Sequence, residues 1–447
     1  MRVLTLLMLA LSASGAQAVT RIVTDAGDAG DGTCDATCTL RDAVDASGAD
    51  DRILFDLLLP NPLVLSLTGP ALIIDVPMRI TATDGVPTVL RRTGGADRLM
   101  RVAPTGDVRI VGLGFEDGLA PATPLPGDAK GGAIYVDAGG ALELRDSVLR
   151  NNRAIAVMNP PGMIGLTGSP ADGGAIYALG DVLMEGCAFI GNVAQGSDAP
   201  PVAGLPIPGS AGGQASGGAI FANGTLVVLN STFHGNVAQG GAGSMGGLGA
   251  GFPIGPAGGS GGTASGGAIA ATLMSVPSVA FSTFVANQTI GGPGGAGGIP
   301  DGPPGPPGIV AGEAISSSAA SIINTSILIG SGAASSTCAG AALSQRTDNR
   351  LDGAGCPGLQ VPGLLSQFEP FNVAEPSPVY RPLLGSAVID SSPDCLDALG
   401  AEAVVLDQLL NPRPRPGGGA ELRCDFGAFE ATVVMFADGF EDPPPPP

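Results

Sequence analysis

The chain has 447 residues, which is enough for a large core or a long repeat array. It contains 73 Gly and 40 Pro but is still 44% hydrophobic, which favours ordered strands joined by glycine-rich loops over a disordered chain. The net charge of −20 comes without a basic cluster. This charge argues against nucleic acid and anionic lipid as partners and suits a soluble protein outside the cell.

The first 18 residues have the layout of a secretory signal peptide. Arg2 supplies the positive start, an apolar stretch follows, and Ala16-Gln17-Ala18 forms a cleavage site of the small-x-small type. The alternative is a buried apolar helix. We expect a signal peptide over 1–18, export, and a mature chain starting near Val19. No later stretch is long and apolar enough to predict a transmembrane segment.

The segment DGTCDATCTLRDAVDAS (31–47) predicts a short helix within an N-terminal cap over 19–52. Thr39 and Asp42 have the spacing of a capping box, and a short apolar stripe follows Thr39. A helix of about two turns would cover the first coil of a repeat array, whose open end would expose strand edges. Four nearby aspartates are not spaced like a calcium-binding loop, so we predict no metal site here: Asp25, Asp28, Asp31 and Asp35.

The phrase GGAIYALGDVLMEGCAFIGN (173–192) recurs from 131, 217 and 266, with a divergent copy at 312. One column of the aligned copies is asparagine: Asn152, Asn192, Asn236 and Asn287, with Ser331 in the fifth copy. Another column is phenylalanine or leucine: Leu149, Phe189, Phe233, Phe284 and Leu328. Such columns are typical of arrays in which equivalent residues stack. We expect the rings to stack inside and the asparagines to form an amide ladder at a bend.

The strand-like stretches between these columns are short, and Gly-Gly pairs interrupt any helical period. A chain that stacks the same strand on itself in each repeat pairs its strands in parallel. We therefore predict an all-β fold, a right-handed parallel β-helix (solenoid) with repeats over 53–335. The coils before Gly131 are less regular.

The repeats are longer than one coil, and the excess falls in one place, after the asparagine and before the next Gly-Gly pair. The alanines that follow these pairs are 42, 44, 49 and 46 residues apart. The extra residues form Gly/Pro-rich inserts over 153–172, 193–216, 237–265 and 288–311. Insertions at one point of each coil must emerge along one edge of the solenoid. They are either tolerated surface loops or a glycine-rich binding fringe.

Export would permit disulfides, and the chain has seven cysteines. The pairs nearest in sequence are Cys34–Cys38, Cys338–Cys356 and Cys395–Cys424, although sequence cannot prove connectivity. Cys187 occupies a column otherwise held by serine, which predicts a small, buried, free thiol.

Three stretches resemble known families of bacterial surface proteins. DGTCDATCTLRDAV resembles the CSLREA-type motif, and the GGAI and FxxN pairs resemble repeats of chlamydial polymorphic outer-membrane proteins. The segment 336–430 resembles a choice-of-anchor domain through Asn349, LLGS from Leu384, Ile389-Asp390, Asp407-Gln408, Arg413-Pro414 and CDFGAFE from Cys424. These resemblances imply a surface-exposed or secreted parallel β-helix and no common activity.

The chain also departs from these families. Only 17 residues follow Glu430, so we see no C-terminal β-barrel, and no LPxTG-like signal is present. The tail over 431–447 resembles the short F-x-D-G-F-E tails of some exported proteobacterial proteins and is expected to be disordered. The mode of attachment stays open.

Candidate catalytic groups are scarce. The one histidine, His234, occupies a column filled by Ile190 and Val285 in sister repeats, which indicates a structural position. The carboxylates of the repeats form no recurring column: Asp137, Glu143, Asp146, Asp172, Asp181 and Glu185. The zinc-binding spacings CxxC and HxxxH are absent, and a Ser-His-Asp triad would have to use His234. We predict no catalytic residue, no metal site and no cofactor.

The sequence thus favours a secreted or cell-surface protein that is not an enzyme and serves adhesion or ligand binding. The expected ligand is a polysaccharide or a protein of a host or neighbouring cell. A polysaccharide-degrading lyase or hydrolase with an unrecognised site is the alternative, and a passive structural layer is a third possibility. Aromatic side chains exposed along one face would favour glycan binding, whereas two carboxylates roughly 5–9 Å apart in a groove would favour hydrolysis.

Overall fold

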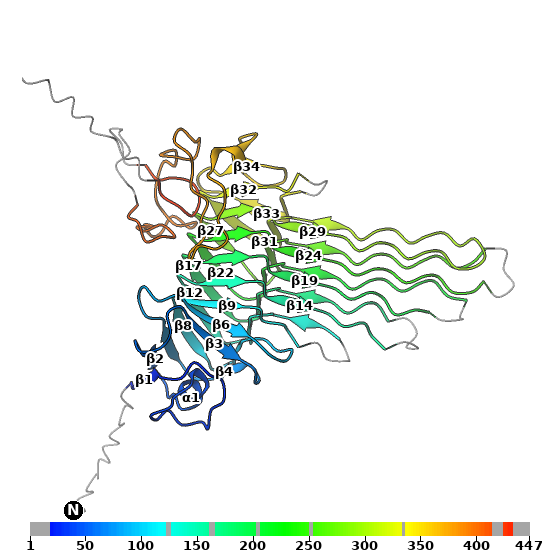
Figure 1. Cartoon of the computed structure of the whole chain (residues 1–447). Helices are drawn as coiled ribbons and strands as arrows, with labels where there is room; N and C mark the ends of the chain where they lie inside the picture. Colours follow the sequence, from blue (N-terminus) through cyan, green and yellow to red (C-terminus); the bar gives the residue numbers. More distant parts are fainter. Residues whose placement is uncertain are drawn as a thin grey trace, which may run out of the picture.

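The computed structural model describes residues 18–121, 127–160, 166–202, 206–249, 254–332, 336–413 and 423–431. Nearly all of the predicted signal peptide and tail, and part of the choice-of-anchor resemblance, lie outside these ranges. The described part is almost entirely β, with long parallel sheets and two short helices, α1 (Leu40–Asp45) and the 3₁₀ helix η1 (Leu364–Gln367). Equivalent strands lie one above the other along the molecule, which gives a solenoid-like body (Figure 1).

Three stacks of strands form this body. The first stack is β1 (Thr20–Val23), β2 (Asp51–Phe55), β5 (Met78–Thr81), β8 (Asp107–Val111), β12 (Ala141–Arg145), β17 (Asp181–Glu185), β22 (Leu226–Leu229) and β27 (Ser278–Ala280). The second is β4 (Leu72–Ile74), β7 (Met100–Val102), β11 (Ile134–Val136), β16 (Ile176–Ala178), β21 (Ile220–Ala222) and β26 (Ile269–Ala271). Strand β31 (Ile315–Asn324) pairs with both stacks and with β33 (Cys338–Ser344), so together they count as one 16-stranded sheet.

The third stack is a separate 10-stranded sheet. Its members are β3 (Leu63–Leu67), β6 (Thr88–Arg92), β9 (Leu113–Glu116), β13 (Val148–Arg150), β18 (Ala188–Ile190), β23 (Thr232–His234), β28 (Thr283–Val285), β32 (Ile327–Ile329), β34 (Arg350–Asp352) and β35 (Leu359–Gln360). Alternate residues of its strands and of the other two stacks are fully buried, as Leu142, Leu144 and Leu149 are, and join one hydrophobic core.

Helix α1 begins at the predicted capping box. Thr39 accepts a hydrogen bond from the backbone N–H of Asp42, and the Asp42 carboxylate accepts one from the N–H of Thr39 at 3.0 Å. Leu40 and Val44 of this helix are buried in the same core, and the helix contacts β1 and β4. Burial favours the neutral acid, but the hydrogen bonds from Thr39 and Gly32 hold the pKa of Asp42 below its usual value.

The recurring Gly-Gly pair has a conformational reason. The first glycine of each copy has a positive φ of 63° to 67°, a region that suits glycine. At the second, a Cβ on Gly218 would lie 2.0 Å from the carbonyl oxygen of Gly267 in the next coil. Glycine is therefore needed twice, once for the turn and once for the close stacking of coils.

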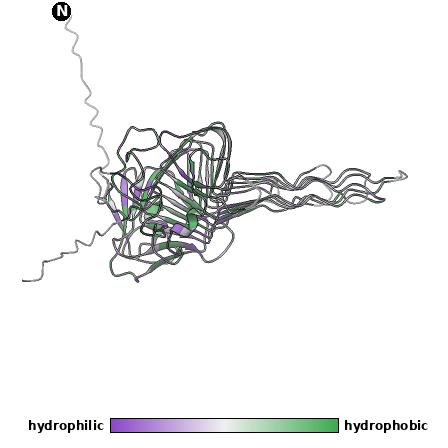
Figure 2. Cartoon of the chain, turned by 90° about the horizontal axis from the view of Figure 1, so that it is seen from above, coloured by the Kyte–Doolittle hydropathy of each residue, from purple (hydrophilic) through white to green (hydrophobic). Residues whose placement is uncertain are grey.

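The four inserts form a projecting structure that we call the blade. At its base are a 4-stranded sheet, β14 (Arg153–Ile155), β19 (Val193–Gln195), β24 (Val237–Gln239) and β29 (Gln288–Ile290), and a 5-stranded sheet, β10 (Ala129–Lys130), β15 (Ala171–Asp172), β20 (Ala215–Ser216), β25 (Ala264–Ser265) and β30 (Val310–Ala311). Beyond the base, the inserts run outward and return as stacked extended legs (Figure 1). From above, the blade is thin compared with the body (Figure 2).

The legs of the blade are cross-linked with a period of three residues. In the third leg, the N–H groups of Gly240, Gly243 and Gly246 donate to the outward leg of the next coil at 2.8–2.9 Å. Those of Gly241, Ser244 and Gly247 donate to returning legs at 2.9–3.0 Å. Three residues per turn without hydrogen bonds inside the leg is the pattern of a polyproline-II helix. The third residue of each turn points outward.

The segment after β35 packs on the outer side of the 10-stranded sheet. Asn230, at the entry to β23, donates to the Leu406 carbonyl at 2.7 Å, and Ala428 donates to the Thr283 hydroxyl at 3.1 Å. Phe426 and Tyr380 join a second, smaller apolar cluster with Val285 and Ile327 of the sheet.

Candidate functional site

The predicted ladder asparagines lie at one bend, fully or almost fully buried. The side chain of Asn192 donates to the Leu149 carbonyl at 3.0 Å and to Asn236 Oδ1 at 2.9 Å, and its own Oδ1 accepts from Asn152. Asn236 and Asn287 continue the same arrangement. Each amide thus satisfies backbone groups of the turn and its neighbour in the next coil, which is a structural role.

The predicted aromatic column and Cys187 are equally internal. The rings of Phe189, Phe233 and Phe284 stack with centroid distances of 4.8 and 4.6 Å. Cys187 is free and fully buried, and burial raises the pKa of its thiol to about 12. A thiol in this state is not a nucleophile at neutral pH.

All three cysteine pairs nearest in sequence form disulfides in the structure: Cys34–Cys38, Cys338–Cys356 and Cys395–Cys424. The second disulfide lies beside β33 and the third lies in the C-terminal segment.

The side chain of His234 contacts the C-terminal segment. Its Nδ1 lies 2.7 Å from the Tyr380 hydroxyl, and its ring packs on Phe371 with centroids 4.4 Å apart. Burial lowers the pKa of His234. The imidazole therefore joins the C-terminal segment to the sheet.

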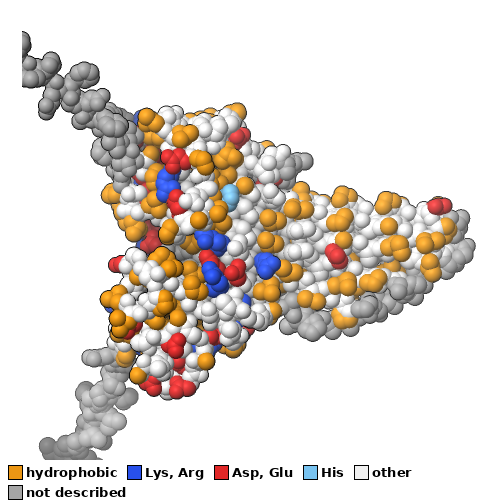
Figure 3. Space-filling view, viewed as in Figure 1, with side chains coloured by type: hydrophobic (Ala, Val, Ile, Leu, Met, Phe, Trp, Pro, Cys, Tyr) orange, Lys and Arg blue, Asp and Glu red, His pale blue; other side chains and the backbone are white. Residues whose placement is uncertain are grey.

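The blade carries an apolar hollow near its far end. Its wall is Pro201, Val202, Met245, Gly246, Gly247, Leu248 and Ile299, around a cavity of about 220 Å³. Met245, Leu248 and Ile299 are 53%, 49% and 59% exposed. The four blade segments 156–170, 196–214, 240–263 and 291–309 contain two charged residues, Asp198 and Asp301. In Figure 3, charged side chains gather over the body, and the blade shows almost none.

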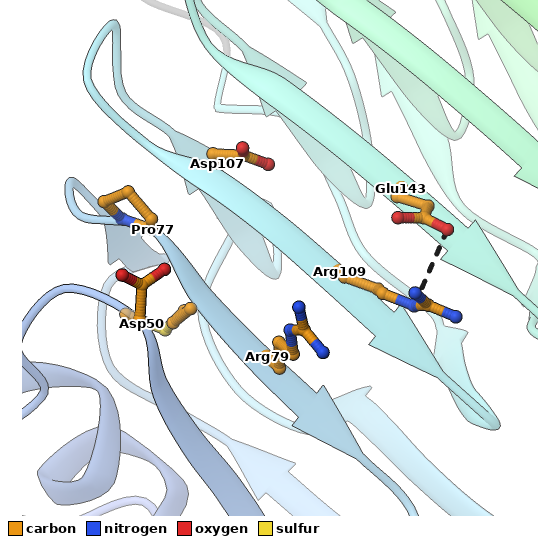
Figure 4. A pocket seen from close by; sticks show the side chains of 7 residues that line it. Asp50, Pro77, Arg79, Asp107, Arg109 and Glu143 are labelled. Carbon is orange, nitrogen blue, oxygen red and sulfur yellow. Dashed lines mark ion pairs between the residues drawn. The ribbon is translucent and has the colours of Figure 1, made fainter. Parts of the chain in front are cut away.

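A polar pocket of about 160 Å³ lies on the outer face of the first stack, far from the blade in sequence. Its wall is Asp50, Pro77, Met78, Arg79, Asp107, Arg109 and Glu143 (Figure 4). Arg79 and Arg109 stand opposite each other on β5 and β8, and Arg52 of β2 precedes them in the same row. Glu143 contacts Arg109 at 3.6 Å but is closer to Arg145, at 2.5 Å.

A larger groove of about 710 Å³ runs between the 10-stranded sheet and the C-terminal segment. Apolar residues such as Val89 and Val148 and four carboxylates line it: Asp84, Glu116, Asp146 and Glu375. Arginines hold two of these, since Glu116 pairs with Arg91 and Arg150 and Glu375 pairs with Arg381. Burial, with a contribution from Glu185, raises the pKa of Asp146 to about 6.

An aromatic row lies on the outward face of the second stack. Tyr135, Tyr177 and Phe221 stack with centroids 5.0 Å apart, and Arg98 covers the ring of Tyr135. Because the rings cover one another, the face of Tyr177 is not open to a sugar. This row therefore stabilises the sheet surface and is a weak candidate for glycan binding.

The polar pocket and the blade hollow were not predicted from the sequence. The arginine row could have been found from the aligned strands DRILF, MRIT and DVRIV, in which one position is always arginine. The blade signal was the triplet run GGPGGAGGI, in which two glycines precede each outward residue.

Among the described residues, no helix is both long enough and apolar enough to span a membrane. In the same part of the chain, no group of three or more His, Cys, Asp or Glu side chains is arranged to hold a metal ion.

No family model matches the sequence. No curated protein matches it significantly either. The resemblances to CSLREA-type, polymorphic outer-membrane and choice-of-anchor proteins therefore stay predictions from the quoted motifs.

Proposed function

We propose that the protein is a secreted or cell-surface adhesin that binds its ligand through the blade. The main support is the hollow around Met245, Leu248 and Ile299, where exposed apolar side chains lie on a surface with almost no charged residues. Contiguous exposed apolar surface on a soluble protein marks an interaction site more often than chance exposure does. The hydrogen-bonded legs present these side chains on a fixed backbone, which lowers the ordering cost of binding.

We also propose that the body is a right-handed parallel β-helix, since the crossover connection between parallel strands is right-handed in almost all proteins. Helix α1 covers its first coil, which the burial of Leu40 and Val44 beside β4 supports. A signal peptide over 1–18 exports the chain, and 336–430 serves as a choice-of-anchor-like segment.

The test uses the purified chain from Val19 and a panel of bacterial and plant polysaccharides and intact bacterial cells. A triple variant, Met245→Ser, Leu248→Ser and Ile299→Ser, removes the apolar side chains without touching the blade hydrogen bonds. The matched control is Leu57→Ser with Leu58→Ser, which are 79% and 92% exposed on the body. We expect the blade variant to lose co-elution with the bound polymer or cell while the control retains it. Equal retention by both variants would refute the blade as the adhesive surface.

A second candidate is hydrolysis of a polysaccharide in the groove beside the C-terminal segment. Asp146 favours it, because a half-buried carboxyl with a pKa of about 6 can act as a general acid near neutral pH. The same polysaccharide panel tests this hydrolase hypothesis when the size of each polymer is measured by chromatography with light scattering. Shortened chains with the wild type, and none with Asp146→Asn, would establish the enzyme. Asp84→Asn, which changes an exposed carboxylate of the same groove, is the control.

A further inference from the structure

We propose that the polar pocket on the first stack is a second binding site, which takes an acidic saccharide of the uronate type. Its chemistry is opposite to that of the blade, and its residues come from the first coils. The site goes beyond adhesion through the blade, and its test does not depend on the blade.

Three arginines form a row across neighbouring strands of the first stack. Arg52, Arg79 and Arg109 face outward from β2, β5 and β8, and each is the register partner of the next. Neighbouring strands are about 4.8 Å apart, so the row brings like charges together, which destabilises a sheet. The row ends at the next coil, because Glu143 of β12 is the register partner of Arg109. Further along β12, Arg145 stands opposite Glu185 of β17 and pairs with it at 2.5 Å.

The row also has too few internal counter-charges. Among the described residues, Arg52 and Arg79 are exposed and make no side-chain ion pair or hydrogen bond. Arg109 has Glu143 at 3.6 Å, and Figure 4 marks this pair and none for Arg79. Glu143 also forms an ion pair with Arg145. The guanidinium groups of Arg79 and Arg109 can therefore bind an external anion. A carboxylate between two guanidinium groups is a strong, directional arrangement.

The acidic side chains of the pocket decide which anion fits. Asp50 and Asp107 lie on either side of Pro77 and line the same pocket as Arg79. Both carboxylates can only accept hydrogen bonds when ionised, so they require donors on the ligand. A dense polyanion such as a nucleic acid would be repelled by them. A uronate sugar meets both requirements, because its carboxylate can bind the arginines and its hydroxyl groups can donate hydrogen bonds to the aspartates.

Calorimetry of the full mature chain tests the site with three probes: an oligogalacturonate, the neutral galactose oligomer of the same length, and acetate. We expect binding of the oligogalacturonate and about tenfold or more weaker binding after Arg79→Gln, since a charged hydrogen-bonded pair is lost. Arg79→Lys should weaken binding less than Arg79→Gln, because lysine keeps the positive charge although it lacks the two parallel N–H donors of the guanidinium group. The control Arg153→Gln removes an exposed arginine at the blade base and should bind like the wild type.

Three results would overturn the proposal. Equal binding of the neutral oligomer would show that the arginines do not select the ligand. Acetate binding as tightly as the oligogalacturonate would reduce the site to a simple anion site. Equal weakening by Arg79→Gln and Arg153→Gln would show only a general charge effect. None of these results bears on the blade, whose variant is tested separately.

Discussion

The coils and the blade stack by two different physical means. In the coils, side-chain stacking adds to the backbone hydrogen bonds of the parallel sheets, because apolar residues, phenylalanine rings and asparagine amides each lie on an equivalent residue of the next turn. In the blade, backbone amides do it, and the hydrogen bonds recur every three residues. The coil columns therefore tolerate any residue of matching size and polarity. The blade positions that face a neighbouring leg leave room for glycine or for a small residue such as Ser244, whose hydroxyl accepts a hydrogen bond from the Ser210 N–H.

This contrast divides the molecule by role. A coil uses its side chains internally and keeps few of them free for a ligand. A blade leg is held mainly by backbone hydrogen bonds, so the outward side chain of each three-residue turn is available at the surface. The blade, which is poor in side-chain packing, thus presents exposed apolar side chains such as Met245 and Leu248.

The largest expected effect is in the aromatic column of the coils. Phe233→Ala removes a fully buried ring that stacks on Phe189 and Phe284, and we expect it to lower the free energy of unfolding by about 3–5 kcal/mol. Urea unfolding followed by circular dichroism measures it. Phe221→Ala, at a half-buried outward ring, is the control and should cost less. Equal losses would contradict an internal role for the column.

The asparagine ladder should give the next largest effect. Asn152→Ala removes the acceptor for the Gly118 N–H and the donor to the Phe115 carbonyl, both in a buried turn. Leaving buried backbone groups unpaired costs about 1–3 kcal/mol each, so we expect a loss of about 2–4 kcal/mol in the same unfolding assay. The neighbouring Asn151 is exposed and has a φ of 55°, a conformation that Ala286 adopts in a later copy. Asn151→Ala should therefore be close to neutral, and an equal loss there would assign the effect to the turn rather than to the amide.

The columns were predictable from the sequence because stacking leaves a repeated side chain in each of them. Phe189, Phe233 and Phe284 are visible in any alignment of the copies, and so are the ladder asparagines. The blade legs were expected only as loops on one edge, because their signal is the missing side chain of paired glycines. The pocket was missed for another reason. Arg52, Arg79 and Arg109 lie in the irregular coils before Gly131, where no repeated phrase fixes the register.

In the blade, a single methyl group should act locally. A Cβ on Gly241 would lie 1.8 Å from the carbonyl oxygen of Ser197, so Gly241→Ala must push two legs apart. We expect a local cost of about 1–3 kcal/mol, with faster hydrogen exchange of the amides of 206–214 and 240–249 and unchanged exchange in β17 and β22. Met245→Ala, which shortens an exposed side chain of the same leg, should leave all of these rates unchanged. Faster exchange throughout the coils would show that the two regions are not separable.

The smallest expected effect lies where the coils meet the blade, and it depends on pH. Asp172 of β15 is half-buried there, and desolvation raises its pKa to about 6, against the opposing charge of Lys130. Between about pH 4 and pH 6 the folded chain keeps a proton that the unfolded chain has lost, so this group's contribution to stability falls as the pH rises through that window. Two pKa units correspond to at most about 3 kcal/mol, and partial solvent exposure of Asp172 screens the effect, so we expect about 1 kcal/mol.

Asp172→Asn cannot titrate and should remove this component. The variant should gain stability relative to the wild type as the pH rises from 4 to 6, with no further change above pH 7. Urea unfolding at each pH measures the difference, and Asp75→Asn, at an exposed carboxylate of the body, should show no such gain. A constant difference across the range would mean that Asp172 is already ionised at pH 4 in the folded chain. The boundary between coils and blade would then be a hydrated surface rather than a desolvated one, and the two regions would be joined by water-exposed polar contacts instead of by burial.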